Sequence, residues 1–448
     1  MSLDLGKASD APGVEVIARR ARDAALTLAT LSTETKNAAL LAVRDLLDLR
    51  REAILAANLR DKNDSQEEVE AGRTTRALFN RLELGGKKFA AMLAGVEDVA
   101  RLEDPVGEVG LATRLDDGLE LYRVSCPLGV IGVIFEARPE AAVQIATLAF
   151  KSSNAVILKG GREASRSNAI LVDTIREALG GIVGVPVDAV QLVSTREEVR
   201  EMLDLDRWID LIIPRGSNEL VRSIQEATRI PVLGHADGIC TVYLDRDADI
   251  AKAERIVVDS KTHYPAACNA VETLLVHRDR LADLLPAVGR ALTGAGVEVR
   301  ADSEAQGSLP GAKPAAGDDW DTEFLDNTLA VKTVGSLEEA VDHINEHGSH
   351  HTDAIVTEDA AAAERFMARV DSAGVYHNAS TRFADGFRYG LGAEVGISTN
   401  KTHARGPVGL EGLVIYKYRL FGSGQVAADY DPGKRPFLHD PIDVKGRR

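Results

Sequence analysis

The chain has 448 residues, of which 45% are apolar and 27% are charged. This composition is typical of a globular protein and excludes a wholly disordered chain, and the length predicts two or three domains or one large α/β unit. With 53 Lys and Arg against 69 Asp and Glu, the net charge is −16, which argues against binding to nucleic acid or to an anionic membrane. The sequence contains no apolar run long enough to span a bilayer and begins without the apolar core of a signal peptide, so we expect a cytoplasmic protein.

Residues 14–100 are predicted to be helical, because apolar side chains recur on one helical face with charged residues between them. This apolar face includes Leu40, Val43, Leu47 and Ile54. Next, two alternating segments flank Asp117-Gly118, a dipeptide that strongly favours a β-hairpin. A two-stranded ribbon cannot bury both faces alone, so we expect it to pack on another element or on another subunit.

From residue 129 onward, short apolar runs alternate with helical stretches, which predicts a parallel, doubly wound sheet covered by helices. The predicted strands of the first stretch are VIGVIF (130–135), AVILK (155–159), QLV (191–193), WIDLII (208–213) and TVYL (241–244). Those of the second stretch, 271–377, include TLLVH, LAVKTV, DAIVT and GVYHN. The last 20 residues are predicted to be an irregular tail, poorly ordered unless docked.

The sequence contains several residues that metals or nucleophilic chemistry could use. The three cysteines, Cys126, Cys240 and Cys268, form no CxxC pair, so neither a zinc ribbon nor a disulfide framework is predicted. The histidines at 343, 347, 350 and 351 allow a metal site, but a helix end capped by Gly348 is favoured because no carboxylate or cysteine stands at ligand spacing. We therefore expect no metal.

Small residues around Cys268 suit either a nucleophile with room for a carbonyl substrate or a buried structural cysteine. Two polar loops, 159–168 and 214–220, follow apolar strands and open helices. Each loop is either an anion-binding turn or a solvated surface turn. Parallel sheets bind ligands at the carboxyl ends of their strands, and the position of both loops there favours the anion-binding alternative.

Long motifs then indicate a family. They are CPLGVIGVIFEARPEAAVQIATLAFKSSNAVILKGGREASRSN (126–168), DLIIPRGSNELV, PVLGHADGICTVYLD, YPAACNAVETLLVH, HTDAIVTED and HNASTRFADGFRYGLGAEVGISTNKTHARGPVGLEGL (377–413). From about residue 14 to 425 the chain resembles the γ-glutamyl phosphate reductases, or glutamate-5-semialdehyde dehydrogenases, of the aldehyde dehydrogenase superfamily. It is especially similar to the reductase half of plant-type pyrroline-5-carboxylate synthetases. The resemblance is weak over 297–320 and ends at the tail.

The resemblance implies an aldehyde dehydrogenase-like fold with a doubly wound cofactor domain, an α/β catalytic domain and a β-ribbon for oligomerisation. We expect residues 1–108 and 127–255 to bind NADP and residues 256–409 to form the catalytic domain. Residues 109–126 and 410–430 would form the ribbon, and residues 431–448 the tail. The implied reaction is the reduction of L-glutamyl 5-phosphate by NADPH to glutamate 5-semialdehyde and phosphate, the second step of proline biosynthesis from glutamate. A glutamate 5-kinase would supply the substrate, and the ribbon implies a homodimer or larger assembly.

The resemblance also implies roles for individual residues. Cys268 would be the nucleophile. His235 would occupy the position at which ordinary aldehyde dehydrogenases carry a water-activating Glu, and its presence suits a thioester that must react with hydride rather than water. Arg138 would lie near the position of their oxyanion-hole Asn, where it either binds the leaving phosphate or forms a salt bridge with Glu136 or Glu140. The implied substrate pocket is completed by Asn269, Asn378 and Ser380.

Cofactor contacts are implied at two cations, one turn and one carboxylate. Lys159 aligns with the superfamily Lys that bonds the adenosine ribose. Arg162 stands where NAD-preferring members often carry Glu, so its guanidinium favours the 2′-phosphate of NADP. Pro214, Arg215, Gly216 and Ser217 align with the turn near the pyrophosphate and nicotinamide, and Glu323 resembles the Glu that bonds the nicotinamide ribose. Two rivals stay open: an acylating dehydrogenase with another acyl donor, such as coenzyme A, and a catalytically silent homologue.

Overall fold

The computed structural model describes residues 12–235 and 237–444. The chain divides into two compact units. The first comprises the described residues of Met1–Gly216, together with Ser223–Val232 and those of Gly409–Arg448, and the second comprises Ser217–Arg222 and Leu233–Val408. None of the helices in the described part of the chain is long and apolar enough to cross a membrane.

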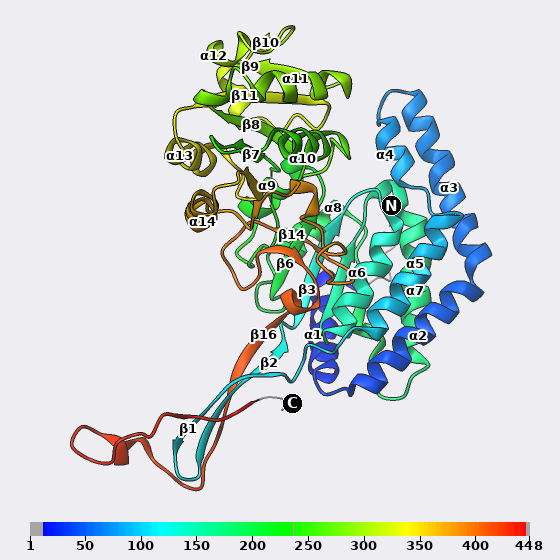
Figure 1. Cartoon of the computed structure of the whole chain (residues 1–448). Helices are drawn as coiled ribbons and strands as arrows, with labels where there is room; N and C mark the ends of the chain where they lie inside the picture. Colours follow the sequence, from blue (N-terminus) through cyan, green and yellow to red (C-terminus); the bar gives the residue numbers. More distant parts are fainter. Residues whose placement is uncertain (1–11, 236, 445–448) are drawn as a thin grey trace, which may run out of the picture. The chain divides into compact units, whose positions relative to one another are not determined.

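The first unit begins with the helices predicted for residues 14–100, and this prediction is confirmed (Figure 1). The apolar face is the buried face, because Leu40, Val43, Leu47 and Ile54 are each at most 1% exposed. The N-terminal helices are α1 (Val14–Leu28), α2 (Thr33–Leu49), α3 (Arg51–Glu70), α4 (Arg76–Arg81) and α5 (Lys87–Arg101).

These helices belong to the same unit as a parallel four-stranded sheet of order β5-β4-β3-β6. The strands are β3 (Val130–Phe135), β4 (Ala155–Lys159), β5 (Val190–Leu192) and β6 (Leu211–Arg215), and the helices between and after them are α6 (Pro139–Lys151), α7 (Ser165–Gly180), α8 (Arg196–Leu203) and α9 (Asn218–Ala227). All six residues of β3 are buried, as expected of a strand covered on both faces. The strand predicted at 208–213 begins instead at Leu211, because Trp208 belongs to a turn in which its amide donates to the carbonyl of Leu205 at 2.9 Å.

The second unit contains a parallel seven-stranded sheet of order β10-β9-β11-β8-β7-β12-β13. Alternate strand residues enter two separate cores: Val242 packs with α10 and α11, whereas Tyr243 packs with α13 and α14. Both faces are therefore covered, and the predicted doubly wound architecture is confirmed. The strands are β7 (Cys240–Leu244), β8 (Val271–His277), β9 (Glu298–Ala301), β10 (Lys313–Pro314), β11 (Thr328–Val334), β12 (Thr352–Val356) and β13 (Gly374–His377). The helices are α10 (Ile250–Thr262), α11 (Leu284–Gly294), α12 (Ser303–Gln306), α13 (Leu337–His347) and α14 (Ala360–Arg369), and a small antiparallel pair joins β14 (Gly396–Ser398) to β15 (Gly406–Val408).

The boundary between the units differs from the one expected at 255/256. β7 pairs with β8 and β12 rather than with the first sheet, so the second unit takes up the chain again at Leu233. The sequence pattern of alternating strands and helices runs unbroken across this point, because it does not record to which sheet a strand hydrogen-bonds.

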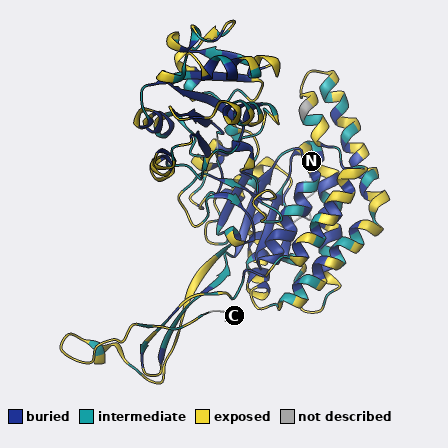
Figure 2. Ribbon diagram, in the orientation of Figure 1, coloured by how far each residue is buried: buried dark blue, intermediate teal, exposed yellow. Residues whose placement is uncertain are grey.

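The predicted hairpin is present as β1 (Val109–Asp116) and β2 (Leu119–Pro127), joined at Asp117-Gly118, where Gly118 adopts φ +69°. β16 (Val414–Phe421) adds to β2, so the sheet order is β16-β2-β1-β17. The tail is more ordered than expected: β17 (Asp440–Pro441) pairs with β1, and Tyr430 donates a hydrogen bond to the buried Asp116 at 2.7 Å. Figure 2 shows that β16 is largely exposed.

Candidate active site

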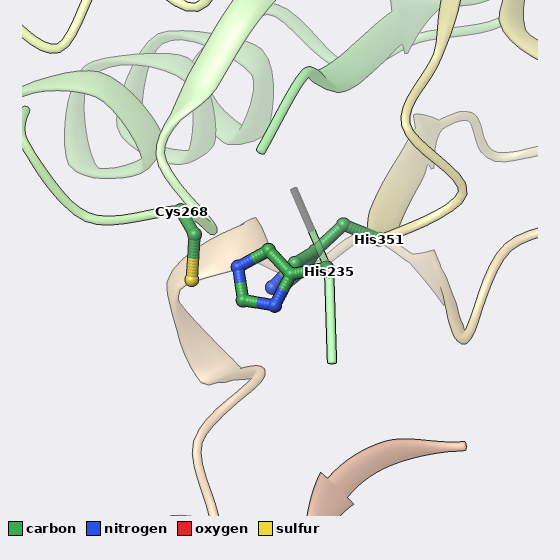
Figure 3. Close-up of side chains that lie close together, drawn as sticks. All are labelled: His235, Cys268 and His351. Carbon is green, nitrogen blue, oxygen red and sulfur yellow. The ribbon is translucent and has the colours of Figure 1, made fainter. Parts of the chain in front are cut away.

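Three side chains converge just before the amino ends of three neighbouring strands of the second unit. His235 precedes β7, Cys268 lies in the turn before β8, and His351 directly precedes β12. Because β8, β7 and β12 are adjacent and parallel, their preceding loops meet at one edge of the sheet. One ring nitrogen of each histidine and the Cys268 sulfur all lie within 4.8 Å of one another (Figure 3).

His235 is held by the backbone of β14, since its Nδ1 lies 3.1 Å from the carbonyl oxygen of Ile397. A carbonyl oxygen can only accept a hydrogen bond, so Nδ1 must carry the proton. In the neutral imidazole, Nε2 then carries the lone pair, which makes it a proton acceptor. His235 also contacts the ring of His351 edge to face, at 5.0 Å between centroids.

His351 is almost completely buried, with 1% of its surface exposed. Burial holds the pKa of His351 well below its usual value, and the nearby His235 and Arg382 lower it further. Its Nδ1 contacts the Thr352 hydroxyl at 2.9 Å, whereas none of the described residues hydrogen-bonds to Nε2. His351 is therefore a neutral ring packed beside His235.

Gly238 allows the chain to pass close to Cys268. A Cβ at this position would lie 2.3 Å from the Cys268 carbonyl oxygen and 2.7 Å from Oε1 of Glu323. Glu323 therefore sits next to the loop of the nucleophile, and Asn218 donates to its other oxygen at 2.8 Å. Glu323, one of the predicted cofactor contacts, therefore lies in the same unit as Cys268 and beside its loop.

A short 3₁₀ turn, η5 (Thr381–Phe383), is fastened to the loop of Cys268. The Thr381 hydroxyl donates to the carbonyl oxygen of Asn269 at 2.7 Å, and the Asn269 amide donates to the carbonyl of Ala384 at 2.8 Å. Ser380 is buried and its hydroxyl accepts from Ser260 at 3.1 Å. Asn269 and Ser380 thus hold the site together, and Asn269 Oδ1 keeps an unused acceptor.

A buried ion pair joins the two elements that flank the loop of Cys268. Lys261 near the end of α10 and Glu272 in β8 flank Cys268 in sequence, and their charged groups meet at 2.5 Å with both side chains fully buried. Burial raises the pKa of Glu272 to about 8, and the contact with Lys261 acts in the opposite direction. The pair joins the two elements on either side of the turn that carries Cys268.

The side chain of Asn378 hydrogen-bonds to the backbone of the neighbouring strand end. Asn378 adopts φ +54°, and its side chain accepts from the Thr357 amide at 3.0 Å and donates to the Thr357 carbonyl at 2.9 Å. These bonds tie the end of β13 to the end of β12.

The predicted cofactor cations lie in the first unit. Lys159 ends β4 and is half-buried, and burial lowers its pKa. Arg162 lies exposed in η1 (Arg162–Ala164), at the start of α7. Among the described residues, neither side chain forms an ion pair or hydrogen bond with another, so both are available to a ligand that offers hydroxyls and phosphates.

The turn after β6 and the start of α6 complete the predicted set. Pro214 and Arg215 end β6, and Gly216 and Ser217 are exposed before α9. Arg138 is exposed at the N-cap of α6, and the ion pairs of the described residues do not include one between it and Glu136 or Glu140.

The histidine-rich segment separates into two environments. α13 ends at His347 with Gly348 as its C-cap, as predicted. His343 is buried against Trp320, and His347 contacts Asp321 at 2.9 Å. Within the described part of the chain, the group able to hold a soft cation such as Zn²⁺ combines His351 with His235 and Cys268, a set that histidine spacing alone did not reveal.

Sequence reasoning missed two residues of this site, His351 and Arg382. His351 was grouped with the end of α13, although it starts the next strand. Arg382 lies in the motif of 377–413 but was not predicted as a site residue. Its position as a cation within the stretch of mostly small residues STRFADG could have indicated it.

Comparison with known proteins agrees with this geometry. The model of the aldehyde dehydrogenase family matches residues 5–309. Gamma-glutamyl phosphate reductase 1 of Synechocystis sp. is 56% identical over 95% of this chain and 97% of its own length, and the probable gamma-glutamyl phosphate reductase of Schizosaccharomyces pombe is 51% identical over 95% and 96%. The crystal structure of gamma-glutamyl phosphate reductase from Thermotoga maritima superposes with a TM-score of 0.89 at 39% identity, covering 93% of this chain and all of that one. The chain therefore belongs to the aldehyde dehydrogenase family and, within it, to the group formed by the gamma-glutamyl phosphate reductases.

Proposed function

We propose that the protein reduces L-glutamyl 5-phosphate to L-glutamate 5-semialdehyde and phosphate, the second step of proline biosynthesis from glutamate. The observation that carries this proposal is the placement of Cys268 within 4.8 Å of a ring nitrogen of His235, in a chain 56% identical to a gamma-glutamyl phosphate reductase. A thiol beside an imidazole is the arrangement that makes a nucleophile for acyl transfer.

The first step is activation of the thiol. Because Nδ1 of His235 donates to the Ile397 carbonyl, the lone pair on Nε2 can accept the Cys268 proton. The resulting thiolate attacks the acyl carbon of the substrate. A C–S bond forms, the C–O bond to the phosphoryl group breaks, and phosphate leaves with the electron pair, so that a thioester remains on Cys268.

The second step is reduction of the thioester, which releases the aldehyde and regenerates the Cys268 thiolate. NADPH, when bound, supplies the hydride that reduces the thioester carbonyl. Cys268 then leaves as the thiolate while the carbonyl re-forms as the aldehyde. We expect little competing hydrolysis, because His235 has taken up the proton of Cys268 by the time the thioester forms and then has no lone pair with which to activate a water molecule.

The family uses a nicotinamide cofactor, and we propose NADP(H) for this chain. Lys159 would bond the adenosine ribose and Arg162 the 2′-phosphate, because both cations lack a partner among the described residues. Pro214, Arg215, Gly216 and Ser217 would contact the pyrophosphate, and Glu323 would accept hydrogen bonds from the nicotinamide ribose. Arg138 would contact the phosphate of the substrate.

We further propose that the chain works in the cytoplasm as a homodimer or larger assembly built through the β16-β2-β1-β17 sheet. The acyl phosphate is a labile substrate, which fits supply by a glutamate 5-kinase. The edge strand β16 supports the assembly proposal, because it exposes Tyr416, Tyr418, Leu420 and Phe421 to at least 50% each.

The reverse reaction tests the activity. Glutamate 5-semialdehyde, NADP and inorganic phosphate are supplied, and NADPH is followed by its absorbance. We expect formation of NADPH that requires phosphate and is lost in Cys268→Ala, while Cys126→Ala, which changes a partly exposed cysteine on β2, keeps it.

Two results would contradict the proposal. Equal rates when coenzyme A replaces phosphate would identify an acylating dehydrogenase with another acyl donor. No NADPH or NADH from folded protein would identify a silent homologue.

A further inference from the structure

Arg382 is a buried cation for which the described residues provide no counter-ion. It lies in η5, only 8% of its surface is exposed, and its Nε has no hydrogen-bond partner in the part of the chain that the structure describes. Asp259 and Asp385 act on it electrostatically, but neither forms an ion pair with it, and Asp385 pairs with Arg388 instead. Within the described residues, its guanidinium makes no hydrogen bond or ion pair at all.

Leaving such a group unpaired is costly. A guanidinium removed from water loses its hydration, and in a folded protein this loss is normally offset by a carboxylate or by several hydrogen-bond acceptors. Burial indeed lowers the pKa of Arg382. An unpaired buried Arg therefore indicates a ligand that brings its own negative charge.

The chain holds Arg382 beside the nucleophile. Thr381, directly before it, and Ala384, two residues after it, are hydrogen-bonded to Asn269 at 2.7 and 2.8 Å, and Asn269 directly follows Cys268. The charge on Cys268 acts on Arg382, and Arg382 acts on His351. The buried cation thus belongs to the same site as the thiol.

This positive charge decides which ligand the site prefers. The ligand atoms of His235, Cys268 and His351 are close enough to hold a cation, but a cation there would be repelled by Arg382 and would occupy the nucleophile. An oxyanion would be attracted, because the five donors of a guanidinium match the oxygens of a phosphate.

We infer that Arg382 is an oxyanion-binding residue beside Cys268 and that, in the reaction proposed above, it binds the phosphate group of the acyl phosphate. The guanidinium would hold the phosphate oxygens as the C–O bond breaks and take up the negative charge that passes to the leaving group. This inference rests on the proposed function for the identity of the anion but not for the existence of the anion site.

The anion site is tested without turnover. Alkylation of Cys268 in the full-length protein is measured by peptide mass spectrometry, with iodoacetate as an anionic reagent and iodoacetamide as a neutral one of similar size. The ratio of the two rates cancels changes in thiol reactivity, and the Cys126 peptide serves as an internal control. In Arg382→Gln we expect this ratio at Cys268 to fall about tenfold, because a charge-assisted hydrogen bond is lost, and inorganic phosphate should no longer protect the thiol.

Two variants complete the design. Arg382→Lys keeps the charge and should keep most of the ratio, and it remains informative if Arg382→Gln does not fold. Arg365→Gln removes an exposed Arg from α14 and should behave as the wild type. An unchanged ratio in folded Arg382→Gln would overturn the inference even if the protein proved to have no reductase activity.

The identity of the anion is read from the reverse reaction. If Arg382 binds phosphate, Arg382→Gln should raise the KM for phosphate about tenfold or more while the KM for the semialdehyde stays near the wild-type value. A rise confined to the KM for the semialdehyde would overturn the assignment to phosphate and assign Arg382 to the carboxylate of the substrate.

Discussion

At the residue scale, the chemistry of the site depends on the protonation state of each ionisable group and on what surrounds it. The Ile397 carbonyl sets the tautomer of His235, burial keeps His351 neutral, and Arg382 carries a charge that no described residue pairs. These three conditions favour an anionic substrate and a thiol that can transfer its proton. The same balance explains why a cluster of two histidines and a cysteine serves better as a catalytic group than as a metal site.

His343 provides a test of burial at a single residue. Burial lowers its pKa from 6.5 to about 3, so the folded protein keeps the ring neutral while the unfolded chain takes up a proton below pH 6.5. This contribution to stability is therefore complete above pH 6.5 and is lost as the pH falls toward 3. We expect His343→Phe to reduce the loss of unfolding free energy between pH 7 and pH 5 by about 2 kcal/mol, measured by denaturant titration at both pH values.

His263→Gln provides the control for this measurement, because His263 is an exposed histidine at the end of α10. It should keep the pH dependence of the wild type. Equal pH dependence in wild type and His343→Phe would show that His343 is not held neutral in the folded protein.

At the element scale, the site follows from the order of strands. Parallel sheets usually bind ligands beyond the carboxyl ends of their strands, and the loops at 159–168 and 214–220, which follow β4 and β6, obey this rule in position. In the second unit, by contrast, the nucleophile and both histidines precede β8, β7 and β12. The adjacency of these three strands, which the sequence pattern does not contain, brings their preceding loops together.

The sequence pattern predicts the individual strands and helices but not which strands pair with one another. Strands such as VIGVIF (130–135) and TLLVH (273–277) were predicted because buried parallel strands are largely apolar, and the N-terminal helices because their apolar residues share one face. Which sheet β7 joins, and where the tail docks, depends on pairing between distant segments. Cys268 and His235 were located through a family resemblance, whereas Arg382 becomes conspicuous only when its burial and missing partner are known.

At the scale of the whole molecule, the proposed assembly can be tested through β16. A single edge strand with several half-exposed aromatic and aliphatic side chains favours association with a second copy. We expect the double variant Tyr418→Glu/Leu420→Glu to form a smaller species than the wild type in sedimentation-velocity experiments, because it buries two charges in the interface.

The control is Leu49→Glu, which makes one Leu-to-Glu change of the same kind at an 81% exposed position at the end of α2. It should sediment as the wild type does. A monomeric wild type at micromolar concentration, or an unchanged assembly in the double variant, would contradict the proposed role of the sheet.

The central claim is that Cys268 carries a thioester that phosphate, and not water, releases. Rapid mixing of the enzyme with glutamate 5-semialdehyde and NADP in phosphate-free buffer tests it most directly. We predict one equivalent of NADPH per active site, a glutamyl group on the Cys268 peptide by mass spectrometry, and no further NADPH until phosphate is added. Continued turnover without phosphate, or a burst without a modified Cys268, would contradict the account.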